Sequence, residues 1–101
     1  PNFSAHLFFA ALATALGLIF SIGSFEWLIL ILTISSVVVS EMFNTAIEVV
    51  TDAMKEHKKS EKDDYYIMVA KDIGAGAVLL SAIASVVIGL VIFGSRLLAA
   101  F

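Results

Sequence analysis

Residues 73–95 read IGAGAVLLSAIASVVIGLVIFGS, and none of these 23 side chains carries a charge. Asp72 stands directly before this run and Arg96 directly after it. An α-helix rises about 1.5 Å per residue, so the run is long enough to cross a hydrocarbon core of roughly 30 Å. We therefore predict a transmembrane helix over about residues 72–95.

Two more segments have the same character. Residues 7–25 carry no charge, and Ser21-Ile22-Gly23-Ser24 predicts a turn near their end. Glu26 and Trp27 then indicate a membrane–water interface, and a second apolar segment follows to about Met54. The chain is thus predicted to be an all-α membrane protein, a single domain over residues 1–101 with transmembrane helices at about 7–25, 27–54 and 72–95.

The composition agrees with a membrane protein. Hydrophobic residues make up 60% of the chain and charged residues 15%, whereas a soluble domain averages about 25% charged residues. The mean hydropathy is +1.02. A large soluble enzyme is excluded, and the lack of cysteine excludes disulfides, a thiolate nucleophile and a cysteine-bound zinc site. The net charge of −3 argues against a nucleic-acid partner.

Basic residues predict the orientation in the membrane. The segment between the second and third predicted helices contains five lysines, at positions 55, 58, 59, 62 and 71, whereas the turn between the first two contains none. Loops rich in lysine and arginine stay in the cytoplasm. Residues 55–64 are therefore expected to form a solvated cytoplasmic loop, with the N-terminus inside and the C-terminus outside.

Polar side chains form a stripe along the second predicted helix. Successive residues of a helix are rotated by about 100°, which places five of them on one face: Glu41, Asn44, Thr45, Glu48 and Asp52. Glu41 follows Trp27 by 14 residues, or about 21 Å, and so lies at hydrocarbon depth. A carboxylate at that depth is a functional candidate by default.

These residues also have structural interpretations. A protonated or partnered Glu41 could simply hold helices together, although we consider this the weaker reading. For Asn44 and Thr45, helix contact is about as favoured as catalysis, because uncharged polar residues are common where membrane helices meet. For Asp52 the structural interpretation is favoured, because a carboxylate near a solvated helix end needs no special explanation.

Lys71 and Asp72 stand at the entry to the third predicted helix. Alone they would indicate a favourable charge at a helix N-terminus and a positive-inside anchor. We expect them, however, at the same level as Glu48. Mg²⁺ is usually held by one or two carboxylates together with phosphate oxygens, and a lysine can neutralise phosphate charge. With Asn44, these residues indicate a metal–phosphate site.

Soluble kinase signatures are absent from the sequence. It contains neither the phosphate-binding loop G-x-x-x-x-G-K-[ST] nor G-x-G-x-x-G, and Gly74-Ala75-Gly76 is more simply a close-packing patch between helices. Three helices cannot shield a whole polar stripe from lipid. We therefore expect a homo-oligomer that buries the stripe between protomers.

Two of these segments resemble motifs of a known family. Residues 41–48 (EMFNTAIE), followed by Asp52, and residues 70–79 (AKDIGAGAVL) are similar to the E-x-x-N-[ST]-A-I-E and A-K-D-x-x-[AS]-[AG]-A-V-L motifs of the small bacterial integral-membrane lipid kinases, which comprise diacylglycerol kinase and undecaprenol kinase. Asn2-Phe3 with His6, and Glu26-Trp27, add to the likeness. The resemblance extends over essentially the whole chain.

The resemblance implies an ATP-dependent lipid kinase of the bacterial inner membrane, a homotrimer with active sites shared between subunits at the cytoplasmic interface. The γ-phosphoryl group of Mg-ATP would pass to a lipid hydroxyl, with undecaprenol slightly favoured over diacylglycerol. The implied roles are a general base for Glu41, a Mg²⁺ ligand for Glu48, and nucleotide and phosphate binding for Asn44, Lys71 and Asp72. The family's N-terminal amphipathic helix, with a further acidic metal ligand, would precede Pro1.

Two other functions remain open from the residues. A small proton- or cation-coupled transporter would use Glu41 as its titrating carboxylate and would not require Lys71 and Asp72. A non-catalytic assembly subunit would use the polar stripe only to hold helices together. In that case Glu41→Gln would leave the protein functional.

Overall fold

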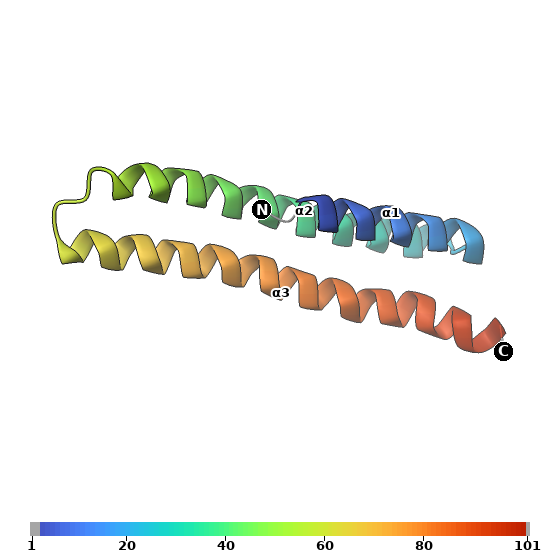
Figure 1. The fold of residues 1–101 in the computed structure, drawn as a ribbon. Helices are drawn as coiled ribbons and strands as arrows, with labels where there is room; N and C mark the ends of the chain where they lie inside the picture. The colour runs from blue at the N-terminus through green and yellow to red at the C-terminus, as the bar shows by residue number, and fades with distance from the viewer. Residues whose placement is uncertain (1–2, 101) are drawn as a thin grey trace.

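The computed structural model describes residues 3–100 as three α-helices: α1 (Phe3–Phe20), α2 (Ser24–Lys55) and α3 (Glu61–Ala100). Figure 1 shows α2 and α3 as a long antiparallel hairpin. The shorter α1 packs along only the half of the hairpin that is remote from the α2–α3 loop, so the first turn of α1 lies near the middle of the hairpin. The protomer is elongated, with extents of 61 × 20 × 17 Å.

All three helices are long and apolar enough to cross a membrane. This confirms the predicted all-α fold with three transmembrane helices, and the chain is a multi-pass membrane protein. Most large apolar side chains are exposed on the protomer, Leu80 and Leu98 among them. Such a surface suits lipid, where helices satisfy their own backbone hydrogen bonds and need no water.

The hairpin is held by a seam with alternating spacings of three and four residues. Among the covered positions, the seam follows 30, 34, 37, 41, 44, 48 and 51 on α2 and 67, 71, 74, 78, 81, 85, 88 and 92 on α3. This spacing is the heptad pattern of helices that pack nearly parallel to each other in a left-handed sense. Three polar residues of the predicted stripe, Glu41, Asn44 and Glu48, therefore lie in the seam itself.

The turn between α1 and α2 lies where the sequence predicts it. Ser21 adopts a left-handed backbone with φ 51°, and the amides of Ser21 and Ile22 donate to the carbonyls of Leu18 and Gly17. This pair of bonds is a Schellman motif, which satisfies the last carbonyls of α1 and reverses the chain. Ile22 is consequently buried.

A small apolar cluster closes the end of the molecule beside this turn. Ile22, Leu30 and Ile92 are its buried members, one from the turn and one from each hairpin helix. Arg96 on α3 forms an ion pair with Glu26 on α2 and donates to the carbonyl of Phe20 at the end of α1. All three helices are thus joined at this end.

The polar segment between the hairpin helices is only partly a loop. Residues 55–64 were expected to be a solvated loop, but α2 continues to Lys55 and α3 already begins at Glu61. The hydroxyl of Ser60 accepts a hydrogen bond from the amide of Asp63, as a helix N-cap does. Polar composition does not distinguish a solvated helix from a loop, and the three acidic residues in the first turn of α3 favour a helix start.

Candidate functional site

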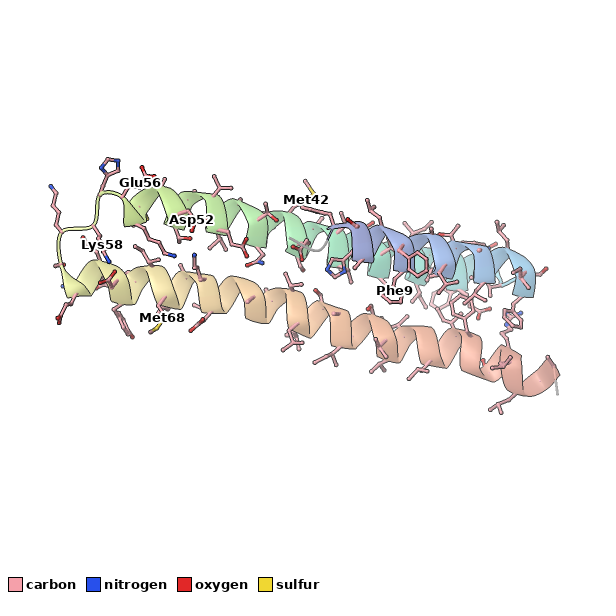
Figure 2. All side chains as sticks on the ribbon, in the orientation of Figure 1. Phe9, Met42, Asp52, Glu56, Lys58 and Met68 are labelled. Carbon is pink, nitrogen blue, oxygen red and sulfur yellow. The ribbon has the colours of Figure 1, made fainter. Side chains whose placement is uncertain are left out.

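A cleft of about 720 Å³ lies between the three helices. Apolar side chains from all three helices line most of its length, and Figure 2 shows Phe9 directed into the space between α1 and α3. Four residues with polar side chains gather at the end nearer the α2–α3 loop: His6, Glu41, Asn44 and Glu48. A cleft that is apolar along most of its length and polar at one end can bind an apolar molecule that carries one polar group.

Glu41 is the most enclosed acidic residue described, with 3% of its surface exposed. Its Oε2 atom lies 3.2 Å from Nε2 of His6 on α1. The hydroxyl of Thr45, one turn later, donates a hydrogen bond to the backbone carbonyl of Glu41. The Thr45 hydroxyl is thus bonded to its own helix. The carboxyl group is therefore already enclosed within a single chain. Burial of the stripe between copies of the chain stays a prediction.

Asn44 continues the site one turn closer to the loop. Its Nδ2 atom donates to Oε1 of Glu48 at 3.3 Å. Its Oδ1 atom is buried and accepts no hydrogen bond within residues 3–100. This oxygen packs against Gly74 on α3, where a Cβ atom would lie only 2.6 Å away. A buried acceptor without a protein donor is unusual in proteins.

Lys71 pairs with Asp52 rather than with Glu48. The Nζ atom of Lys71 lies 3.0 Å from Oδ1 of Asp52, and Nζ of Lys55 lies 3.8 Å from the same oxygen. Figure 2 shows Asp52 directed from α2 toward α3 and Met42 directed to the opposite side. Asp52, for which we favoured a structural interpretation, thus forms an ion pair with Lys71 that joins α2 to α3. An ion pair at a solvated surface contributes little to stability.

Asp72 is exposed, and its side chain makes no hydrogen bond or ion pair with the described residues 3–100. Helical spacing places it on the same row as Ala75 and Leu79, both of which line the cleft. The fold thus brings Glu41, Asn44 and Glu48 together on α2, with Lys71 near Glu48 on α3. Asp72 is not among the residues that line the cleft.

His6 is the member of the site that our sequence reasoning did not select. It contributed to the family resemblance, but we assigned it no role. The sequence does contain a signal for His6, which is a lone titratable residue in an apolar segment. His6 and Glu41 are separated from the turn by nearly the same number of residues, so two antiparallel helices would place them at the same level. Asn2, named with it in the resemblance, lies outside the described residues.

The described residues do not form a ready-made metal centre. No group of three or more histidine or acidic side chains within residues 3–100 is placed to hold a metal ion. Glu48 lines the cleft, and its carboxylate interacts electrostatically with Lys71. This suits Mg²⁺ that arrives with phosphate oxygens, since Mg²⁺ needs only one or two protein carboxylates in such complexes.

The fold defines a membrane protein of three long apolar helices, and comparison with known proteins establishes its family. A family model described as prokaryotic diacylglycerol kinase matches residues 1–93. The chain belongs to this family, and it is a lipid kinase with a nucleotide phosphoryl donor and a lipid substrate. Family membership favours this function over the transporter and the assembly subunit.

The chain is also similar to a curated protein that is named as a lipid kinase. The undecaprenol kinase of Bacillus subtilis (strain 168) is 34% identical over 96 residues, which cover 95% of this chain and 74% of that protein. No solved structure matches the chain.

Proposed function

We propose that this protein transfers the γ-phosphoryl group of ATP, with Mg²⁺, to the hydroxyl of a membrane lipid alcohol at the cytoplasmic face of the bacterial inner membrane. One observation carries the proposal: the enclosed carboxyl of Glu41 lies where a long apolar cleft meets a polar cluster. A lipid alcohol matches such a cleft, because it consists of apolar chains with a hydroxyl group at one end. Undecaprenol is the favoured acceptor, because the relative described above is an undecaprenol kinase.

The proposed chemistry at the acceptor is simple. The lipid O–H bond breaks and its proton passes to the Glu41 carboxylate, while the lipid oxygen forms a bond to the γ-phosphorus. The bond from that phosphorus to the nucleotide breaks, and the nucleoside diphosphate leaves with its electron pair. In phosphoryl transfer most of the rate acceleration comes from positioning the reactants and neutralising charge. A nearby base removes the proton of the acceptor hydroxyl.

We assign binding of the phosphoryl donor, Mg-ATP, to the polar residues at this end of the cleft. Glu48, beside the cleft and bonded to Asn44, would hold Mg²⁺ together with nucleotide phosphates. When bound, Mg²⁺ would neutralise charge that develops on the phosphates. Lys71 is held by Asp52 at this end of the hairpin and would contribute a point charge, and Asp72 completes the phosphate site.

We also propose that the active molecule is a homotrimer. The protomer exposes large apolar side chains along all three helices, and its cleft is open at the side. Neighbouring copies of the chain would cover part of this surface and complete the polar end of the cleft. They would also supply partners for the exposed side chain of Asp72, which makes no hydrogen bond or ion pair with the described residues 3–100.

The decisive test is a transfer assay on the full-length protein in detergent micelles, after its trimeric mass has been verified. Phosphate transfer from Mg-ATP to undecaprenol and to diacylglycerol is measured side by side. We expect transfer to undecaprenol. Glu41→Gln should lower kcat by roughly 10²–10⁴-fold, because general-base catalysis contributes about that much to the rate. Glu48→Gln should raise the KM for Mg-ATP. Absence of transfer to both lipids from a folded trimer would refute the proposal.

A further inference from the structure

His6 and Glu41 join the first two helices at the polar end of the cleft. The imidazole Nε2 atom lies 3.2 Å from Oε2 of Glu41, and the two side chains are 17% and 4% exposed. The residues are 35 positions apart in the chain, so only the packing of α1 on α2 brings them together. Both side chains line the same cleft.

The charge state of a base determines the direction of this hydrogen bond. Glu41 must be ionised in order to take a proton, and an ionised carboxylate can only accept hydrogen bonds. In the reactive state His6 therefore carries its proton on Nε2 and donates it to Oε2 of Glu41. A neutral imidazole is sufficient for this role.

A carboxylate as enclosed as Glu41 has lost most of its hydration, which makes its charged form unfavourable unless hydrogen bonds replace the water. A donor aimed at a charged oxygen gives one of the stronger hydrogen bonds in proteins. It also restricts rotation of the carboxyl group. The contact with His6 thus has two effects, since it supports the charge of Glu41 and orients its oxygens.

We propose that His6 is a positioning residue for the phosphoryl transfer, whose Nε2–H group holds Glu41 as an oriented carboxylate at the point where the lipid hydroxyl enters the cleft. This inference rests on the proposed role of Glu41 as the base. The lipid proton still passes to Glu41, and His6 neither gives up nor takes a proton in the step. His6 acts on the reaction only through the carboxylate.

Three variants of the full-length protein test the inference in the undecaprenol assay. His6→Leu removes the donor, His6→Gln restores an N–H donor of similar reach, and Phe8→Leu is a control on the exposed side of α1. We expect His6→Leu to lower kcat by roughly 10- to 100-fold, the rate equivalent of one charged hydrogen bond, with both KM values nearly unchanged. His6→Gln should recover most of the loss, and Phe8→Leu should match the wild type.

The outcomes separate this inference from the function on which it rests. Full activity of Glu41→Gln would remove the proposed base and this inference with it. An inactive Glu41→Gln beside a fully active His6→Leu would overturn the inference alone. Equal losses in His6→Leu and His6→Gln, or a change confined to the lipid KM, would also overturn it, because neither follows from a missing donor. If His6→Leu fails to fold, His6→Met against His6→Gln makes the same comparison.

Discussion

At the scale of single residues, Gly74 on α3 packs closely against the side chain of Asn44 on α2. The absence of a Cβ at Gly74 lets the Asn44 amide lie against α3, with its Nδ2 atom directed to Glu48. The side chains of Asn44 and Glu48 are both part of the proposed nucleotide site. A glycine on α3 therefore controls the orientation of polar groups on α2.

Gly74→Ala tests this control. An added methyl group would lie 2.6 Å from Oδ1 of Asn44, so the amide must rotate and its hydrogen bond to Glu48 is lost. We expect kcat/KM for Mg-ATP to fall roughly tenfold, about the value of one hydrogen bond. Steady-state kinetics measures this fall. Gly76→Ala is the matched control, because a Cβ there meets no atom within 4 Å, and equal kinetics for the two variants would contradict the expectation.

At the scale of elements, α1 carries His6 and must be held against the hairpin. Gly17 makes this possible near the end of α1, because the Trp27 ring of α2 occupies the space that a side chain would need. A Cβ at Gly17 would lie 2.7 Å from Cη2 of Trp27 and 3.2 Å from Cδ1 of Ile22. The position of α1, and through it that of His6, depends on this contact.

Gly17→Ala should therefore loosen α1. We expect the free energy of unfolding to fall by about 1–3 kcal/mol, the usual range for overpacking a closely packed site. Titration with a denaturing detergent, followed by circular dichroism, measures the change. Gly94→Ala at the same end of the molecule has open space around the new methyl group and should leave the unfolding midpoint in place. An unchanged midpoint for Gly17→Ala would contradict the role assigned to Gly17.

At the scale of the whole molecule, the hairpin is longer than a bilayer is thick. The 32 residues of α2 and the 40 residues of α3 correspond to about 48 and 60 Å, against a hydrocarbon core of roughly 30 Å. The polar end of the hairpin, with Asp52 and Lys71, therefore projects beyond the hydrocarbon. A soluble nucleotide can reach that end while the lipid stays in the membrane.

Cysteine labelling can establish which side this end faces. The chain contains no cysteine, so each engineered one is unique. We expect a membrane-impermeant maleimide to label His57→Cys in inverted inner-membrane vesicles and not in spheroplasts, because the lysine-rich segment is predicted to be cytoplasmic. Ser24→Cys, at the opposite turn, should give the reverse pattern. Labelling of His57→Cys from outside would show that the predicted orientation is wrong.

The three helices and the polar stripe could be predicted from the chain alone, because both depend on local physics. Lipid favours helices for any long apolar segment, and the rotation between successive residues places Glu41, Asn44 and Glu48 on one face. The turn at Ser21 follows from local signals as well. The polar start of α3 was missed because a solvated helix and a loop have similar compositions.

The partners of these residues depend on how the helices pack, and no local pattern contains that information. Glu41 meets His6, Lys71 meets Asp52, and Asn44 packs on Gly74. Each contact joins two helices and changes if one helix shifts along its neighbour by a single turn. The heptad seam and the close packing at Gly17 and Gly74 establish that register, and the register determines which polar atoms meet.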